Sequence, residues 1–338
     1  MDNRPAKKRI LFIGTGGTIA SELSGGSLSP ALGAAQLLHL VPEVFRLCAP
    51  DAVQLFELDS TDICPEHWLR IAETVIEAYD RYDGFVIAHG TDTMAYTASA
   101  LSYLIQNSSK PIVLTGAQKP IGFETTDSKQ NLTDSFLCAA SGMAGVLVVF
   151  GGQVLLGTRA RKTRSKSFSA FSSPNYPPLA TIQNSRLTRF FDPTEGDPRF
   201  YHALDSSVGL LKLTPGTDVE LLDFMLERYH ALVIESFGVG GLPNRGGRFR
   251  DSIRRATEAG KLVALTTQVP SEGTDLSVYE VGSGLTDMGV LEAFDMTPEA
   301  CFTKLMWLLA CTSDTESRRR LFYTPICHDI LPPDIYLT

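Results

Sequence analysis

The sequence GFVIAHGTDTMAYTASAL at residues 84–101 decides the fold. Its first residues form a short apolar run, which predicts a buried β-strand ending near His89. A helical pattern follows and continues through Leu101. Between them lie Gly90, Thr91 and Asp92, which place backbone donors, a hydroxyl and a carboxylate side by side at the carboxyl end of the strand. A strand that leads directly into a helix is typical of an α/β protein.

The same alternation of strand and helix runs through the first half of the chain. Further apolar runs bounded by turn residues predict buried strands at 10–13, 53–58, 112–115 and 146–150. The clearest helical pattern is Pro65–Tyr82, in which Trp68, Ile71 and Val75 fall on one face. This alternation implies a parallel sheet covered by helices on both faces, with ligands bound beyond the carboxyl ends of its strands.

A second alternation follows a stretch rich in Pro, Asn, Asp and Arg. It predicts strands at 208–213, 232–236 and 262–267 and helices at 218–229, 249–259 and 298–309. We therefore expect an α/β fold with a large N-terminal parallel-sheet domain at 1–190, a linker at 191–206 and a smaller C-terminal α/β domain at 207–338.

Composition narrows the functional classes. With 338 residues, of which 43% are hydrophobic, the chain is long and apolar enough for two packed cores. The formal net charge of -8 makes nucleic acid and anionic membranes poor partners. The six cysteines show neither a CxxC pair nor a histidine spacing that holds zinc, so we expect reduced thiols and no metal site. The apolar run at 10–13 is too short for a secretory signal, which predicts a cytoplasmic protein.

Three loops that follow predicted strands carry candidate ligand-binding residues. The first is Gly14–Ile19, where glycines allow close approach of the backbone to a ligand. A nucleotide site is the rival interpretation of this loop. However, Ile19 stands in place of the last glycine of the dinucleotide motif, and the lysine of a P-loop is absent. The second contains Asp59, Ser60 and Thr61, for which a turn or helix cap is the simpler explanation.

The third loop contains Asp92, whose alternative role is to cap the helix that follows. We favour a ligand site because glycine, hydroxyl and carboxylate together suit a zwitterionic amino acid. Two further stretches are the strand end Thr115–Gln118 and the basic run Arg159–Lys166. Most basic runs of this kind are solvated surface.

Two motifs in this order resemble the signatures of bacterial-type L-asparaginases. They are Thr15–Ala20 (TGGTIA) and His89–Leu101 (HGTDTMAYTASAL). The resemblance extends over nearly the whole chain and is nearest to the cytoplasmic, type I branch. Further matching segments are DSTDI at 59–63, DGFVI at 83–87, TGAQKP at 115–120, FSAFSSPNYPPL at 168–179, SFGVG at 236–240 and DMTPEACFTKL at 295–305. The family's fold has a large and a small α/β domain, assembled as a dimer or, as a dimer of dimers, a homotetramer.

The resemblance implies hydrolysis of free L-asparagine to L-aspartate and ammonia, without metal or organic cofactor. It places the nucleophile at Thr18, a second essential threonine at Thr91 and its lysine partner at Lys162. Asp92 would meet the substrate ammonium. The full set of substrate-binding residues that it implies is Gly17, Asp59, Ser60, Thr61, Gly90, Thr91, Asp92 and Ala117.

These implied roles are chemically coherent. A threonine hydroxyl is a weak nucleophile until its proton is removed, and a neutral, partly buried Lys162 would assist Thr91 or a water. The Thr91 N–H is our candidate oxyanion donor. The reaction then proceeds through an acyl-enzyme or by direct attack of water. The resemblance also implies that the substrate carboxylate meets Ser60 and N–H groups near Gly17 and Gly90.

The chain departs from the family pattern in one place. Members carry a tyrosine in a Gly-Tyr-x-Pro segment after the first motif, whereas residues 25–30 are GGSLSP. Tyr279 and Tyr176 are candidates to replace that tyrosine. Candidates for the family's intersubunit acid are Glu272, Asp275 and Glu280.

Simpler interpretations apply to other polar residues. His89 is expected to be a packed residue at a strand end, and Thr126 and Asp127 are expected to cap a helix. Two other functions stay open. One is an ammonia-supplying subunit of a tRNA-dependent amidotransferase, although the signature beginning at Thr15 leaves no room for the extra N-terminal domain of such proteins. The other is a catalytically weak asparagine sensor.

Overall fold

The computed structural model describes residues 6–24, 27–193, 196–278 and 284–331. The chain divides into two compact units, Met1–His202 and Ala203–Thr338. This division falls inside the segment at 191–206. Part of that segment is a strand, because β14 (Arg199–Phe200) pairs with β6 (Ile105–Gln106) of the first unit.

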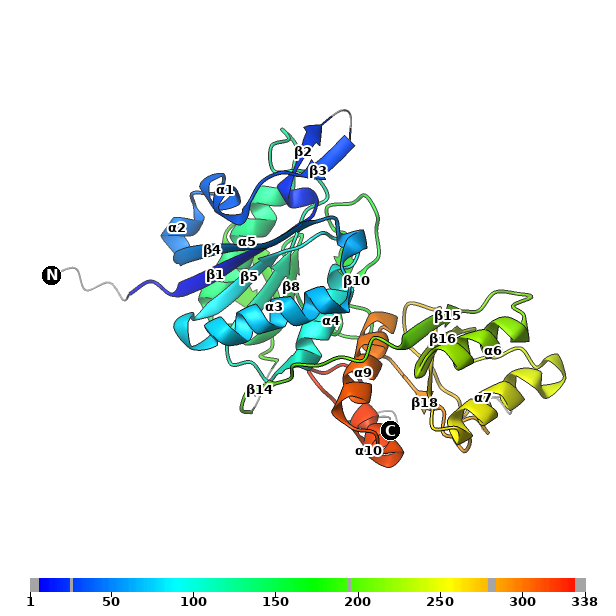
Figure 1. Cartoon of the computed structure of the whole chain (residues 1–338). Coiled ribbons are helices and arrows are strands. Elements are labelled where there is room, and N and C mark those ends of the chain that lie inside the picture. The colour runs from blue at the N-terminus through cyan, green and yellow to red at the C-terminus, as the bar shows by residue number, and fades with distance from the viewer. Residues whose placement is uncertain (1–5, 25–26, 194–195, 279–283, 332–338) are drawn as a thin grey trace. The chain divides into compact units, whose positions relative to one another are not determined.

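The first unit is built on an eight-stranded sheet with the order β13-β12-β9-β8-β7-β5-β1-β4 (Figure 1). The strands β4, β1, β5, β7 and β8 are parallel, as the alternating pattern predicts. Three antiparallel strands, β9, β12 and β13, extend the sheet beyond β8, and the sequence patterns did not predict them. The strand bounds are β1 Arg9–Gly16, β4 Ala49–Leu58, β5 Gly84–Ala88, β7 Pro111–Thr115, β8 Gly145–Phe150, β9 Gln153–Leu156, β12 Ala180–Gln183 and β13 Arg186–Arg189.

Helices cover both faces of this sheet (Figure 1). One face carries α1 (Ala34–His39), α2 (Val44–Leu47) and α5 (Ser128–Ser141), and the other carries α3 (Pro65–Ala78) and α4 (Met94–Leu104). The predicted helix at 65–82 thus ends at Ala78 and continues only as the 3-10 turn η3 (Tyr79–Arg81).

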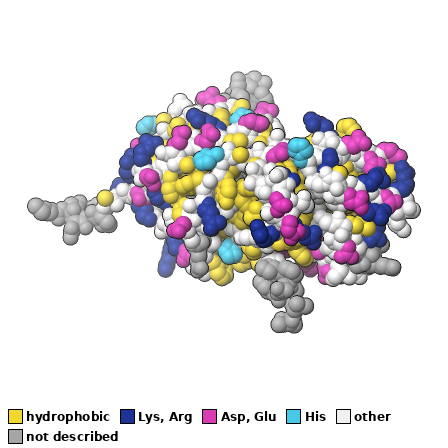
Figure 2. Space-filling model, turned by 60° about the horizontal axis from the view of Figure 1, so that its bottom comes forward, with side chains coloured by type: hydrophobic (Ala, Val, Ile, Leu, Met, Phe, Trp, Pro, Cys, Tyr) yellow, Lys and Arg dark blue, Asp and Glu magenta, His cyan; other side chains and the backbone are white. Residues whose placement is uncertain are grey.

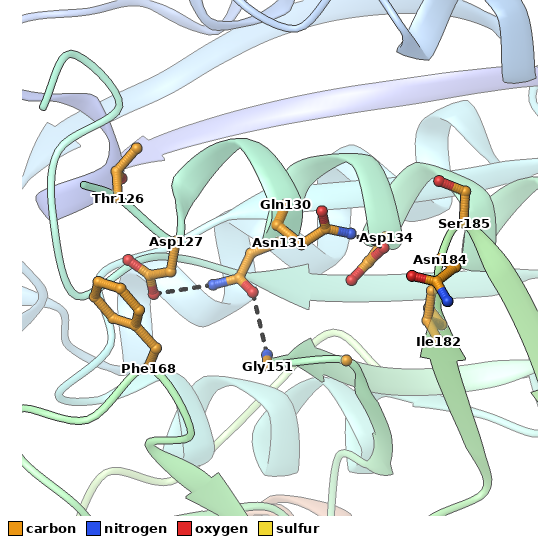
Figure 3. A pocket seen from close by; sticks show the side chains of 11 residues that line it. Thr126, Asp127, Gln130, Asn131, Asp134, Gly151, Phe168, Ile182, Asn184 and Ser185 are labelled. Atoms are coloured by element: carbon orange, nitrogen blue, oxygen red, sulfur yellow. Dashed lines mark hydrogen bonds between the residues drawn. The ribbon is translucent and has the colours of Figure 1, made fainter. Parts of the chain in front are cut away.

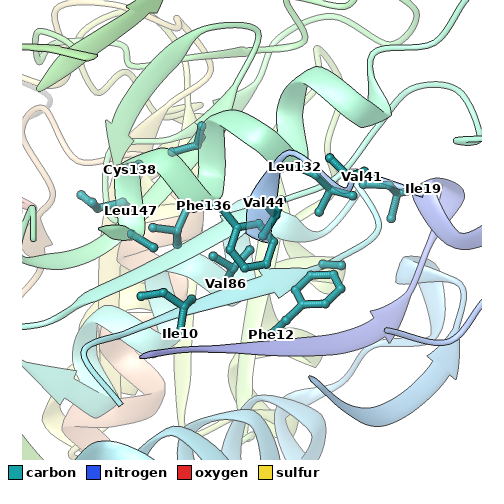
Figure 4. Packing of buried hydrophobic residues seen from close by; sticks show 14 of the residues in the cluster. Ile10, Phe12, Ile19, Val41, Val44, Val86, Leu132, Phe136, Cys138 and Leu147 are labelled. Carbon is teal, nitrogen blue, oxygen red and sulfur yellow. The ribbon is translucent and has the colours of Figure 1, made fainter. Parts of the chain in front are cut away.

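The main hydrophobic core of the unit lies under α5. Phe12 of β1 contacts Phe136 of α5 with their ring centroids 5.5 Å apart, and Val86 of β5 and Leu147 of β8 belong to the same core (Figure 4). Burial of such side chains contributes roughly 1.5–3 kcal/mol each. The core holds the carboxyl ends of the central strands in fixed positions.

The strand β4 is less buried than the apolar run at 53–58 suggests. Its residues are half-buried or exposed, whereas every residue of β5 is buried. The reason is position, because β4 is the edge strand of the sheet and pairs only with β1. The sequence correctly predicted a strand at this place, but the prediction that the strand is buried was wrong.

Short elements complete the first unit. Two antiparallel pairs lie outside the main sheet: β2 (Ser21–Ser24) with β3 (Ser27–Pro30), and β10 (Arg161–Lys162) with β11 (Phe171–Ser172). The 3-10 helices η1 (Thr18–Ala20) and η2 (Ser60–Asp62) directly follow β1 and β4. These short elements give the loops beyond the strands a defined backbone.

The second unit is a smaller α/β structure with a four-stranded parallel sheet of order β15-β16-β17-β18. Its elements, largely as the sequence predicts, are β15 Val208–Lys212, α6 Val219–Arg228, β16 Ala231–Ser236, η4 Arg245–Gly247, α7 Arg248–Glu258, β17 Leu262–Thr267, β18 Leu291–Glu292, α9 Pro298–Cys311 and α10 Thr315–Tyr323. Its core contains Leu222, Ile234, Phe249 and Leu265, none of which is exposed.

Charged side chains of both signs are intermingled over most of the face seen in Figure 2. Among the described residues, no helix combines the length and the hydrophobicity needed to cross a bilayer.

Candidate active site

The carboxyl ends of four parallel strands meet at one edge of the sheet of the first unit. In the order β7-β5-β1-β4 these strands are direct neighbours. The loops that follow them contain Gly116–Lys119, His89–Thr93, Gly17–Ala20 and Asp59–Ile63 respectively. Neighbouring strand ends bring together candidate residues that are far apart in the sequence.

Glycines allow these loops to approach one another closely. A Cβ atom on Gly17, whose φ is 80°, would lie 2.5 Å from the backbone nitrogen of Gly90. A Cβ atom on Gly90 would lie 2.5 Å from the Cβ of Ser60. Since both distances are far below van der Waals contact, the loops after β1, β5 and β4 touch through positions that tolerate no side chain.

Hydrogen bonds between the loops hold this arrangement. The Gly17 N–H donates to the Leu58 carbonyl at 2.9 Å, and the Thr15 hydroxyl donates to the Ala88 carbonyl at 2.8 Å. The Thr93 hydroxyl donates to the Ser60 carbonyl at 2.7 Å. The predicted tight glycine loop is therefore packed against its neighbouring loops.

Lys162 joins two candidate residues of the loop after β5. Its Nζ donates to Thr91 Oγ1 at 2.7 Å and forms an ion pair with Asp92 Oδ1 at 2.6 Å. The Lys162 side chain is 16% exposed and the Asp92 side chain 61% exposed, so the carboxylate is open to a ligand while the lysine is largely enclosed. Lys162 lies opposite Phe171 in the β10–β11 pair. In the basic run at 159–166, Lys162 is therefore not a solvated surface residue.

A network based on Asp127 positions the loop after β7. The Asp127 carboxylate accepts hydrogen bonds from the backbone N–H groups of Gln118 and Lys119 and from Asn131 Nδ2. Asn131 Nδ2 also donates to the Gly116 carbonyl. The Thr91 hydroxyl in turn faces Gln118 Oε1 at 3.4 Å.

The role of Asp127 in this network was not predicted from the sequence. Asp127 is at the N-cap position of α5, as predicted, but its side chain makes no capping bond to the helix and instead holds the 116–119 loop. The available signal was the Thr-Gly-Ala-Gln sequence at the end of β7, whose backbone donors need an acceptor.

His89 is a packed residue, as expected. It is completely buried, its Nδ1 lies 2.7 Å from the Gly90 carbonyl oxygen, and its Nε2 lies 2.9 Å from Thr97 Oγ1. Burial lowers the pKa of His89 to about 4, so the ring is neutral at physiological pH.

The remaining candidates differ in how they are placed. Thr18 begins η1 directly after Gly17 and is half-buried. Asp59 accepts hydrogen bonds from the N–H and the hydroxyl of Thr61, at 2.9 and 2.8 Å, in a self-contained turn. Ser60 is buried against Gly90. Ala117 has its side chain in the hydrophobic core, so only its backbone is available to a ligand.

Of the candidates for replacing the family's tyrosine and acid, only Tyr176 is a described residue of the first unit. Tyr176 packs against the core beside the guanidinium of Arg159, 5.3 Å from its ring centroid, and burial raises the pKa of its hydroxyl. Tyr279 and Glu280 lie outside the described residues. Glu272 and Asp275 belong to the second unit.

Within the part of the chain that the structure describes, no group of three or more His, Cys, Asp or Glu side chains is arranged to hold a metal ion.

Comparisons with known proteins identify the family of the chain. Residues 9–194 match the family described as "Asparaginase, N-terminal", and residues 207–322 match the "Glutaminase/Asparaginase C-terminal domain". The chain is 40% identical to the L-asparaginase of Thermococcus kodakarensis, over 95% of this chain and 99% of that protein. It is 36% identical to a glutamyl-tRNA(Gln) amidotransferase subunit from Pyrococcus abyssi, over 98% of this chain and 79% of that protein.

A solved structure shows the same fold. The thermostable L-asparaginase from Thermococcus kodakarensis superimposes with a TM-score of 0.91 at 39% identity, covering 96% of this chain and 99% of that one. The family models account for most of the chain, in the order and at the positions of its two units. This chain therefore belongs to the asparaginase family.

Proposed function

We propose that this chain hydrolyses the side-chain amide of L-asparagine to give L-aspartate and ammonia. The observation that carries the proposal is the position of Lys162, whose Nζ lies 2.7 Å from the Thr91 hydroxyl and 2.6 Å from the Asp92 carboxylate. Nucleophile activation and recognition of an ammonium group need such groups within hydrogen-bond distance of one another.

Substrate binding uses the two charges of a free amino acid. The exposed Asp92 carboxylate receives the substrate ammonium. The substrate carboxylate meets the Ser60 hydroxyl and the backbone N–H groups near Gly17 and Gly90, which the close contacts of the three loops hold in place. Recognition of both charged groups directs the side-chain amide to the threonines.

The chemical step divides between the two threonines. Thr18 Oγ1 attacks the amide carbon, the hydroxyl proton passes to the amide nitrogen, and the carbon–nitrogen bond breaks to release ammonia. Water then cleaves the acyl-threonine ester, which gives the aspartate carboxyl group and returns a proton to Thr18 Oγ1. In the alternative route, Thr91 and Lys162 activate a water that attacks the amide directly. In both routes the Thr91 N–H stabilises the developing oxyanion.

The ion pair defines where Lys162 can act. In the absence of substrate its Nζ donates to the Thr91 hydroxyl and is paired with the Asp92 carboxylate. When the substrate ammonium reaches Asp92, it competes with Lys162 for that carboxylate, while the contact of Lys162 with Thr91 is retained. Lys162 is therefore placed to take part in the transfer of the Thr91 proton.

The proposal also covers cofactors, substrate preference, assembly and location. The reaction needs neither metal nor organic cofactor, and glutamine is a weaker substrate. The protein is a cytoplasmic homo-oligomer, a dimer or a tetramer, and binds neither nucleic acid nor membrane. An asparaginase is favoured over an amidotransferase component because the chain is 40% identical to the L-asparaginase relative and 36% identical to the amidotransferase relative.

The experiment is a measurement of ammonia release from asparagine by wild type, Thr18→Ala and Thr91→Ala. We expect both variants to lose activity by about 10²–10⁴-fold, since each removes a group used in the transition state. Thr188→Ala, an exposed position on the edge strand β13, is the control for loss of a threonine hydroxyl.

Unchanged rates in both active-site variants would exclude this mechanism. Calorimetric binding of asparagine to wild type without ammonia release would identify a sensor in place of an enzyme.

A further inference from the structure

The first unit contains a second feature that the proposed reaction does not use. A cavity of about 470 Å³ lies between α5, the β8–β9 turn and the β12–β13 turn (Figure 3). Its wall is formed by the first two turns of α5, by Gly151 and Gly152, by Phe168 and by Asn184 and Ser185. This volume is in the range of small-molecule sites.

Asp134 is a buried carboxylate in the wall of this cavity. The residue is 1% exposed. Its Oδ1 accepts a hydrogen bond from Gln130 Nε2 at 2.7 Å, whereas its Oδ2 is buried and has no hydrogen-bond partner among the described residues. A buried carboxylate oxygen without a donor is costly, and in native structures such an atom usually marks an interaction still to be made.

The charge of the cavity is one-sided. The described residues that line it include two carboxylates and no Lys, Arg or His. The other carboxylate, Asp127, already accepts from two backbone N–H groups and from Asn131. Asp134 is two helical turns away, about 10 Å along α5. The unmet requirement is therefore a single positive charge with a donor hydrogen at the Asp134 end.

We propose that this cavity binds a small aliphatic ammonium ion, whose NH₃⁺ group donates to Asp134 Oδ2. A guanidinium fits less well, because its parallel donors need both carboxylate oxygens and Oδ1 is occupied by Gln130. A divalent metal fits less well too, since calcium requires six to eight oxygen ligands and magnesium an octahedral set. An ammonium is a compact charge that needs only one carboxylate oxygen and nearby neutral acceptors.

Neutral acceptors lie at the same end of the cavity as Asp134, on the turn between β12 and β13. Asn184 and Ser185 form the two-residue turn between β12 and β13, and Figure 3 shows both side chains on the Asp134 side of the cavity. Their φ angles are 51° and 59°. Such a turn favours glycine at its second position. Ser185 therefore carries a side-chain hydroxyl at a position where the backbone conformation favours a residue without a side chain. The Asn184 amide oxygen and the Ser185 hydroxyl supply acceptors for the other ammonium hydrogens.

Phe168 provides an apolar surface at the Asp127 end, where the Lys119 ammonium lies 5.8 Å from its ring centroid. The carbon chain of the ligand extends along this wall, away from Asp134. This inference rests on Asp134 and its cavity and is independent of asparagine hydrolysis.

The test is calorimetric titration of the full-length protein at neutral pH with n-butylammonium chloride, with 1-butanol as an uncharged ligand of equal length. We expect saturable binding of the ammonium and no binding of the alcohol. Asp134→Asn should weaken ammonium binding by about tenfold or more, because it removes a hydrogen bond to a charged group. Glu124→Gln, an exposed position outside the cavity wall, should bind as wild type.

A second variant guards against loss of folding. Ser185→Gly suits the turn and should fold at least as well as wild type, yet bind the ammonium several-fold more weakly. Undiminished binding in both Asp134→Asn and Ser185→Gly would overturn the proposal. The proposal would also be overturned if 1-butanol, or potassium chloride at the same ionic strength, gave the same heat as the ammonium. Absence of ammonium binding by wild type would overturn it too.

Discussion

Lys162 contacts two residues that follow the same strand, and this contact holds three polar groups of the candidate site together. Its ammonium is shared between the Thr91 hydroxyl and the Asp92 carboxylate, while its stem is largely enclosed. An isolated surface ion pair contributes little to stability. The arrangement is better explained by the proposed proton transfer than by folding.

Lys162→Met tests this explanation, because it keeps the enclosed stem and removes the amine. We expect kcat for asparagine to fall by about 10²–10⁴-fold with only a small change in the free energy of unfolding. Steady-state ammonia release and urea denaturation measure the two quantities. Lys166→Met, at an exposed position of the same basic run, is the control. A variant at 162 with wild-type kcat would remove Lys162 from the mechanism.

Asp134 makes a separate prediction on pH. Burial raises the pKa of Asp134 from 3.8 to about 6, so the folded chain holds this proton at pH values where the unfolded chain has released it. Its contribution to stability is therefore present at low pH and is lost as the pH rises towards 6 and above.

Asp134→Asn removes that dependence. Relative to wild type, the variant should gain about 1–3 kcal/mol of unfolding free energy between pH 4.5 and pH 7.5. Denaturation curves at the two pH values measure the gain, and Glu124→Gln should show none. A difference between Asp134→Asn and wild type that is equal at both pH values would contradict the raised pKa.

Single residues also show where reasoning from sequence stops. The position of Asp92 between a strand and a helix was predictable, because an apolar run ends just before it and a helical pattern begins just after it. Lys162 was not, because it is 71 positions from Thr91 and no local pattern links them; only the family resemblance identified it. Asp127 was predicted at the right place with the wrong role, because its carboxylate accepts from the 116–119 loop instead of capping α5.

At the scale of elements, the loops after β1, β5 and β4 form one unit because glycines allow backbone contact. Gly17→Ala would place a Cβ against the Gly90 backbone at a φ of 80° that alanine tolerates poorly. Neither the steric contact with the Gly90 backbone nor the unfavourable φ can be relieved by rotating a side chain.

We expect Gly17→Ala to lose about 1–3 kcal/mol of stability and most of its activity, since the loops must separate. Thermal unfolding and ammonia release measure both losses. Gly122→Ala is the matched control, because a Cβ there meets nothing within 4 Å and its φ is not in the left-handed region. Full activity in Gly17→Ala would show that close contact of the loops is dispensable.

The elements themselves were predicted unevenly. The parallel strands and the helices between them follow from alternating apolar runs, and both are present. The antiparallel extension by β9, β12 and β13 was missed because these strands are short and two of them are half exposed, so they carry little periodic signal. The burial of β4 was overestimated because sequence does not reveal which strand lies at an edge.

At the scale of the whole molecule, the second unit depends on one buried ion pair. Lys304 of α9 and Asp329 are both completely buried, with Nζ and Oδ2 2.7 Å apart. Lys304 also donates to the Thr324 carbonyl, and Asp329 Oδ1 accepts from the Ile326 N–H. These bonds attach the chain after α10 to the core of the unit.

Lys304→Met should destabilise the protein by about 3–5 kcal/mol, because Asp329 is left buried without its counter-charge. The double variant Lys304→Met with Asp329→Leu should recover much of the loss, since no lone charge remains. Urea unfolding of wild type, both single variants and the double variant gives the coupling energy. Additive effects of the two substitutions would contradict a direct interaction.

The two-unit organisation was predictable from the repeated alternation of strand and helix around a Pro-rich segment. The ion pair was not, because Lys304 resembles an ordinary polar residue on a helix and Asp329 lies beyond the last periodic pattern.

The attachment through Asp329 also has a consequence for biosynthesis. A ribosome adds Lys304 to the chain before it adds Asp329, so the helix that carries the lysine emerges without its anion. The second unit cannot close around that amine until residue 329 has been added. A nascent chain that stalls shortly before residue 329 would thus keep a half-closed module, open to chaperones and proteases, even though every earlier segment had been synthesised.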